Sequence, residues 1–172
     1  MMDTTWNESI WRQFGAAIDM LDNALVACPD ELWDARIWGE PPESAGYSKF
    51  WYVAYHALFW LDLYLSGSEE GFSPPDPYTL IEMDPAGLLP ERQYTKSELR
   101  SYLEYGRQKC RAVIETLTDE KACMRCSFSW GDVSFAELQL YSMRHVQEHA
   151  SQLNLFLGQQ VGASGRWVGR AK

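Results

Sequence analysis

The chain has 172 residues, of which 46% are hydrophobic and 14% aromatic, and its formal net charge is -9 at pH 7. This length and composition predict one folded domain with a substantial core and argue against disorder. The negative charge disfavours nucleic acids and anionic membranes as partners, because both would be repelled. No apolar run is long enough to span a membrane, and the N-terminus lacks the basic and apolar regions of a signal peptide. We therefore expect a cytoplasmic protein.

The first part of the chain predicts two helices joined by a loop. Residues 5–27 carry apolar side chains at spacings of three and four, and Thr5 and Glu8 have the spacing of a capping box. Prolines and a glycine exclude a continuous helix over residues 29–46. Residues 47–66 are apolar nearly all round, which predicts a second helix that is buried on more than one side.

A long connection follows the second predicted helix. Residues 67–94 contain five prolines and three glycines, so no regular element of any length fits there. A connection of this length usually crosses a domain or contributes to a site. It would also allow the helices on either side of it to run parallel. Thr95 and Glu98 have capping-box spacing, and they open a third predicted helix over residues 95–117.

The last part of the chain predicts a fourth helix and a short tail. Residues 118–133 are irregular, with a short extended piece at residues 126–130. Ser134 is an N-cap for a helix that we expect to end at Gly158. Residues 159–172 should be loosely held, with Trp167 as their one anchored side chain.

Four helices of about 20 residues each predict an all-α fold, and specifically a four-helix bundle. We expect a single domain over residues 1–172, with its core at about residues 5–158. Sites in such bundles are built from side chains on facing helices, so polar groups on the apolar helix faces are the candidates for a site.

All three histidines of the chain lie on apolar helical faces. His145 and His149 are four residues apart and therefore project from one face of the last predicted helix. His56 lies in the middle of the second predicted helix. Packed helices are about 8–10 Å apart, so three imidazoles can close on one divalent ion across that gap. Three protein ligands leave a position for water or substrate, which is the pattern of a catalytic site.

The other polar residues of these helices have a plain and a functional interpretation. Tyr52 is one turn from His56 and is either a core aromatic or a hydroxyl that faces a metal-bound ligand. Glu148 is either a polar flank of its helix or a contact of a ligating histidine. Tyr52 and Glu148 are thus the candidate catalytic side chains, beside a metal-bound water or thiol. Trp60 is interpreted as a core aromatic. Asp62 is interpreted as a polar contact either on the helix surface or between helices, and not as a metal ligand, because it points away from His56.

Two further motifs have alternative interpretations. The segment from His145 to His149 also matches the H-x-x-E-H pattern of inverzincin proteases, in which Glu148 would be the general base. That pattern needs a later acidic ligand, and no Asp or Glu follows His149. Cys123 and Cys126 form a lone CxxC without the strand–helix context of a thioredoxin site, so we interpret them as ordinary thiols.

The segment Tyr55-His56-Ala57-Leu58-Phe59-Trp60-Leu61-Asp62, together with His145 and His149, resembles the DinB/YfiT-like superfamily of metalloenzymes over about residues 5–158. The resemblance implies an up-down-down-up bundle with a long crossover between the second and third helices. It implies a divalent metal ion, zinc or nickel, held by His56, His145 and His149. It also implies a homodimer, which exposed positions Leu140 and Leu155 favour as well.

Relatives in that superfamily include bacillithiol-dependent S-transferases and a mycothiol-dependent isomerase. The resemblance therefore implies a metal-dependent transferase or hydrolase that acts on a small molecule, with a low-molecular-weight thiol as a candidate partner. The alternative is a non-enzymatic helical bundle that binds a ligand or partner, with a structural metal or none. Metal content, together with water exchange at any bound metal, separates these two hypotheses.

Overall fold

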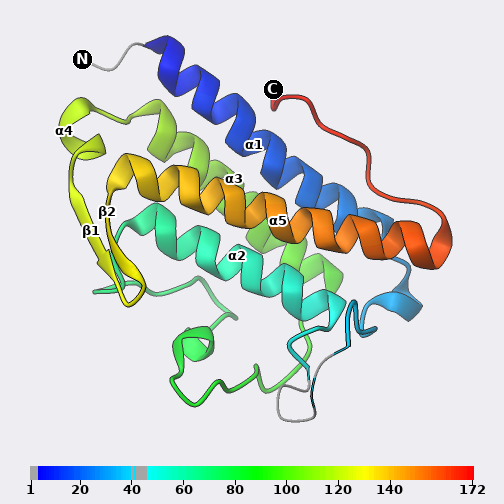
Figure 1. Cartoon of the computed structure of the whole chain (residues 1–172). Coiled ribbons are helices and arrows are strands. Elements are labelled where there is room, and N and C mark those ends of the chain that lie inside the picture. Colours follow the sequence, from blue (N-terminus) through cyan, green and yellow to red (C-terminus); the bar gives the residue numbers. More distant parts are fainter. Residues whose placement is uncertain (1–3, 40, 42–45) are drawn as a thin grey trace.

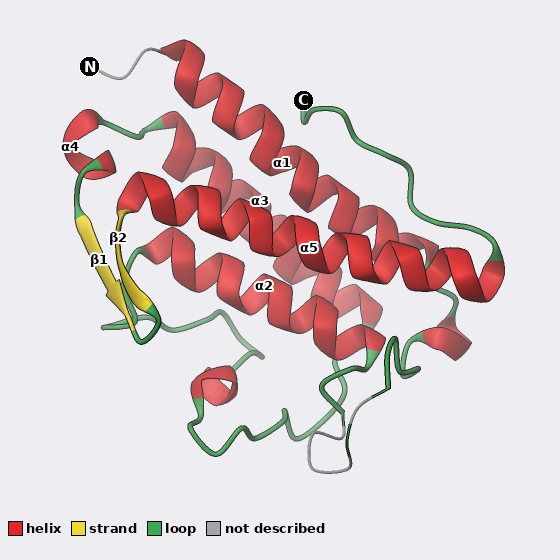
Figure 2. Cartoon of the chain, viewed as in Figure 1, coloured by secondary structure: helices red, strands yellow, loops and turns green. Residues whose placement is uncertain are grey.

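The computed structural model describes residues 4–39, 41 and 46–172, so part of the predicted loop at residues 29–46 lies outside the described residues. The described chain is mostly helical, with one small two-stranded sheet (Figure 2). Its elements are α1 (Thr4–Ala27), η1 (Asp30–Leu32), α2 (Phe50–Ser66), η3 (Leu80–Met83), α3 (Lys96–Glu115), α4 (Asp119–Ala122), β1 (Arg125–Phe128), β2 (Gly131–Ser134) and α5 (Phe135–Val161).

The four long helices pack around one core. Helix α1 lies against α3 and α5, and α2 lies against the same two helices (Figure 1). Nearly every side chain of α2 is buried, which the apolar composition of residues 47–66 predicted. Within the described residues, no helix is both long and apolar enough to cross a membrane. The prediction of an all-α fold is confirmed in that the described chain is mostly helical. The antiparallel hairpin β1–β2 was not part of that prediction.

The predicted helix starts are partly confirmed. Thr95 and Glu98 form the predicted capping box, in which each side chain binds the backbone N–H of the other residue. The Ser134 side chain accepts a hydrogen bond from the backbone N–H of Glu137, as an N-cap does. The box at Thr5 and Glu8 stays a prediction, with Thr5 the second residue of α1 as described.

The predicted end of the last helix is wrong. Helix α5 continues through Gly158 and ends at Val161, where Gly162 takes a left-handed conformation with φ 67°. A glycine ends a helix when its backbone leaves the right-handed region, and its presence in the sequence is not enough. Gly158 remains helical one residue after the buried Leu157, so the helix extends past the core.

The C-terminal tail is held more firmly than we expected. The backbone N–H of Gly165 donates to Asn154 Oδ1 at 2.6 Å, and the N–H of Ala171 donates to the Arg12 carbonyl at 2.8 Å. Ala171 is buried, whereas the Trp167 side chain is 77% exposed. Both parts of the expectation were therefore wrong, because backbone hydrogen bonds to α1 and α5 hold the tail and the indole does not.

A buried ion pair joins α2 to α3. The carboxylate of Asp62 is 1% exposed and accepts hydrogen bonds from Lys109 Nζ at 2.6 Å and from the Tyr102 hydroxyl at 3.0 Å. Burial, followed by the nearby Asp62 charge, raises the pKa of Tyr102. The predicted role of Asp62 as a polar contact between helices is confirmed.

Candidate metal centre

The three histidines meet between α2 and α5. His145 Nε2 lies 3.2 Å from His56 Nε2 and 3.0 Å from His149 Nε2. The three residues offer ligand atoms that all lie within 4.8 Å of one another. The helical spacing of His145 and His149 explains why both face α2, and the packing of α2 against α5 supplies His56.

The outer nitrogens of two rings are held by oxygen acceptors. His56 Nδ1 contacts the carboxylate of Glu82, and His149 Nδ1 lies 2.8 Å from Gln152 Oε1. In a neutral ring, the nitrogen that faces an oxygen acceptor carries the proton, and the Nε2 atom then presents a lone pair. A hydrogen bond of this kind fixes the tautomer of metal-ligating histidines.

The three inner nitrogens, the Nε2 atoms of the histidines, carry too few protons for all of them to be hydrogen-bonded to one another. His145 Nδ1 is buried and has no hydrogen-bond partner among the described residues, so this ring can carry its proton on Nε2. Even then, one N–H faces two lone pairs, those of His56 and His149. A cation at the centre would accept electron density from all three rings, so the donor set fits a metal ion.

The spacing of the donor atoms also fits a metal ion. A tetrahedral ion with metal–nitrogen distances of about 2.0–2.1 Å places its ligand atoms about 3.3 Å apart. The separations of His145 Nε2 from His56 Nε2 and from His149 Nε2, 3.2 Å and 3.0 Å, are close to this value. Only small side-chain movements would be needed to complete such a site.

The surroundings keep the imidazoles of His145 and His149 neutral. Burial, and then the neighbouring charges of His149 and His56, lowers the pKa of His145 to about 3. Burial also lowers the pKa of His149, and the charge of His56 adds to the effect. Neutral imidazole is the form that binds metal, so the site favours the ligand form near pH 7.

Glu82 is the residue of this site that the sequence did not reveal. It lies on η3, within the Pro-rich connection between α2 and α3, and its side chain is 4% exposed. Its carboxylate contacts His56 and also accepts hydrogen bonds from the Tyr52 hydroxyl at 2.9 Å and from Trp60 Nε1 at 3.3 Å. These donors come from three successive turns of α2, so the carboxylate is fixed in place by one helix face.

No local signal identifies Glu82, because its role depends on how residues 67–94 fold back over α2. Gln152 differs in this respect. It is three residues after His149 on the same helix, and that spacing alone would have suggested the contact.

The other candidate residues lie at the edge of the centre. The Tyr52 hydroxyl donates to Glu82 Oε2, and so it supports the carboxylate that holds His56. Glu148 is exposed on the flank of α5 next to His149. Cys123 and Cys126 are free thiols in the hairpin region, and burial raises the pKa of Cys126, which is opposite to the shift of a reactive thiolate.

A known family matches most of the chain. The profile of the DinB superfamily matches residues 13–153, a segment that includes the three histidines and Glu82. A search of curated proteins and a search of solved structures each gave no match.

Proposed function

The chain belongs to the DinB superfamily, and from this premise we propose that it is a metal-dependent enzyme that acts on a small molecule. The proposed ion is zinc or nickel, held by His56, His145 and His149. The proposed reaction is the S-transfer of a low-molecular-weight thiol or a hydrolysis. The alternative remains a non-enzymatic bundle that binds a ligand or partner.

One observation carries this proposal. The Nε2 atoms of three imidazoles converge, while Glu82 and Gln152 hold the outer nitrogens of two of them. A histidine that only filled the core would need one hydrogen-bond partner and no second imidazole at its inner nitrogen. This arrangement has the inner ligands and the outer supports of a metal site.

The position of His56 supports an open site. Its side chain is 29% exposed, so solvent reaches the edge of the cluster. When bound, a divalent ion with three protein ligands supplies a position at which it can lower the pKa of water to about 7 or stabilise a thiolate. Glu148, exposed beside His149, is the proposed proton acceptor at this edge.

We propose for the bundle the up-down-down-up order, with residues 67–94 as the crossover. The packing of α2 against both α3 and α5 supports this order, and the colours of Figure 1 show α2 and α3 running the same way. We also propose a homodimer. Leu140 and Leu155 support it, because they are 47% and 64% exposed on α5.

Glu82 should contribute to metal affinity although it is not a ligand. A Glu82→Gln variant keeps the shape of the side chain but loses the charge that holds the His56 N–H. We expect the metal dissociation constant to rise about 10- to 100-fold, measured by competition with a chelator. Glu91→Gln, an exposed position in the same connection, should leave the constant unchanged. Equal constants for both variants would contradict the role of Glu82.

The thiol reaction is tested by asking whether an external thiol reaches the metal. The chain would be loaded with cobalt(II) and titrated with 2-mercaptoethanol. A thiolate that binds the metal should add a charge-transfer absorption band, and ethylene glycol should add none. If cobalt binds but no thiol changes the spectrum, the thiol-transfer proposal fails. If water exchange at the ion is also absent by proton relaxation, a closed structural metal replaces the enzyme proposal.

A further inference from the structure

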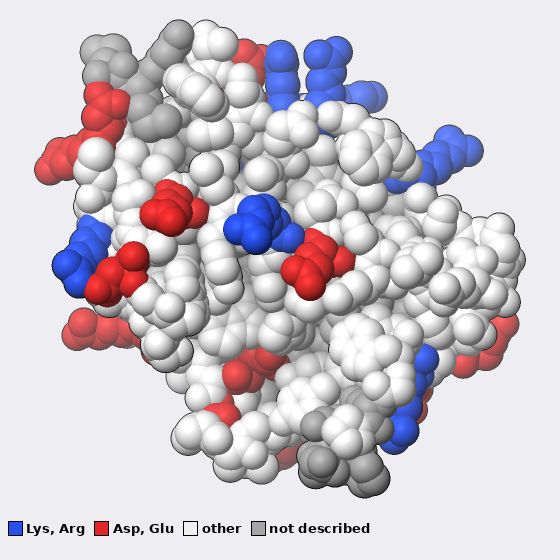
Figure 3. All heavy atoms as spheres, in the orientation of Figure 1, with Lys and Arg blue, Asp and Glu red and all other residues white. Residues whose placement is uncertain are grey.

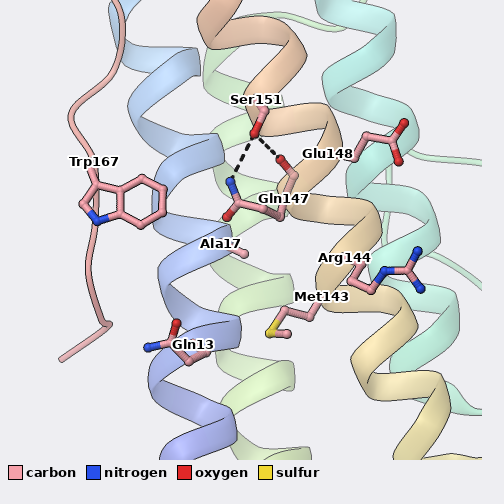
Figure 4. Close-up of a pocket in the computed structure, with 8 residues that line it drawn as sticks. All are labelled: Gln13, Ala17, Met143, Arg144, Gln147, Glu148, Ser151 and Trp167. Carbon is pink, nitrogen blue, oxygen red and sulfur yellow. Dashed lines mark hydrogen bonds between the residues drawn. The ribbon is translucent and has the colours of Figure 1, made fainter.

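A groove lies on the side of α5 away from the histidines. It runs between α1, α5 and the C-terminal tail, and its volume is about 630 Å³ (Figure 4). A helix turns by about 100° per residue, so Met143, Gln147 and Ser151 face this groove while His145 and His149 face α2. The volume is in the range of small-molecule sites, about 300–1,000 Å³.

The groove has an indole as its outer wall. Trp167 projects from the tail toward α1, and its side chain is 77% exposed (Figure 4). The backbone is fixed on both sides of it, since Asn23 Nδ2 donates to the Arg166 carbonyl at 2.9 Å and Gln13 Nε2 donates to the Gly169 carbonyl at 3.2 Å. A large apolar ring on a fixed backbone is thus presented to solvent, which is typical of a binding surface.

Two amide oxygens give the groove its polarity. A carbonyl oxygen only accepts hydrogen bonds, so the group of Gln13 that faces Gly169 must be its NH₂. The Ser151 hydroxyl donates to the main-chain carbonyl of Gln147 at 2.8 Å and therefore accepts from the side-chain Nε2 of Gln147 at 3.2 Å. Both NH₂ groups are engaged within the protein, and among the described residues neither side-chain oxygen has a hydrogen-bond partner.

Among the described residues that line the groove, no charged end points into it. Arg144 and Glu148 are at its rim, and their charged ends point to the other flank of α5 (Figure 4). In the middle of the face shown in Figure 3, a few charged side chains lie in a largely uncharged surface, and more lie at its edges. A charged ligand would lose hydration here without gaining a counter-charge, so an uncharged ligand is favoured.

We propose that this groove binds an uncharged, flat ring compound that carries N–H donors. The ring would stack on the Trp167 indole, its N–H groups would donate to the side-chain oxygens of Gln13 and Gln147, and its edge would pack on Met143. This site is independent of the metal centre, which lies across α5.

The test uses a matched pair of probes, benzimidazolone with two N–H donors and its N,N′-dimethyl derivative with none. Binding would be followed by NMR of the tryptophan indole N–H signals in buffer with EDTA. We expect the Trp167 signal to shift with benzimidazolone, and the dimethyl derivative to bind at least about fivefold more weakly. Trp167→Ala should weaken binding about 2- to 12-fold, and Trp6→Ala, another exposed tryptophan, should not.

Further variants separate this proposal from the metal centre and from self-association. His56→Ala should leave benzimidazolone binding unchanged, and Gln147→Met should weaken it. The proposal is overturned if both probes bind equally, if Trp167→Ala has no effect, or if His56→Ala abolishes binding. It is also overturned if sedimentation shows that Trp167→Ala converts a dimer to a monomer, because a second copy would then occupy the groove.

Discussion

A His56→Ala variant should be purified with almost no divalent metal, whereas the wild-type chain should carry about one ion. His145 and His149 remain on α5 in this variant, but they are two ligands from a single helix. The ion would also lose the only ligand whose orientation Glu82 fixes. The measurement is metal analysis by mass spectrometry after dialysis against buffer with equal zinc and nickel.

A matched control makes this result specific. Gln159→Ala changes an exposed polar residue near the end of α5 and should retain the wild-type metal content. Circular dichroism would show whether each variant keeps its helices. If wild type and His56→Ala carry equally little metal, or equally much, the three-histidine site is wrong.

Replacing Lys109 by methionine should lower the free energy of unfolding by about 3–5 kcal/mol. The change removes the cation that faces Asp62 and leaves a fully buried carboxylate with the Tyr102 hydroxyl as its remaining side-chain donor. The cost arises from the unpaired charge and not from lost packing, because methionine keeps most of the volume. Urea denaturation followed by circular dichroism gives the value.

A control variant and a double variant test whether the unpaired charge causes this loss of stability. Arg111→Met on the same helix breaks an exposed pair with Glu115, so we expect a change within about 0.5 kcal/mol. The double variant Asp62→Asn with Lys109→Met should recover part of the lost stability, because no buried charge remains. A Lys109→Met variant as stable as wild type would show that Asp62 does not need its partner.

The helices were predictable because their signals are local. Apolar residues at spacings of three and four, with the caps at Thr95 and Ser134, located α1, α3 and α5 to within a few residues. The end of α5 is the exception. Whether Gly158 or Gly162 ends α5 depends on which of them leaves the helical conformation, and the sequence shows two glycines without that information.

The part of the candidate site formed by His145 and His149 also follows from the sequence, because its signal is local to one helix. The spacing of His145 and His149 is a property of one helix, so it placed both rings on one face before any packing was known. His56 required the further assumption that its helix lies beside theirs. The structure brings His145 Nε2 within 3.2 Å of His56 Nε2.

Only the tertiary structure decided the contacts between segments whose spacing in the sequence follows no helical period. Glu82 reaches His56 because the Pro-rich connection folds back over α2, and the tail presents Trp167 because backbone hydrogen bonds hold it to α1 and α5. A helix imposes its spacing on the side chains it carries, so the sequence itself determined those positions. A loop imposes none, and its side chains find their partners only when the whole chain packs.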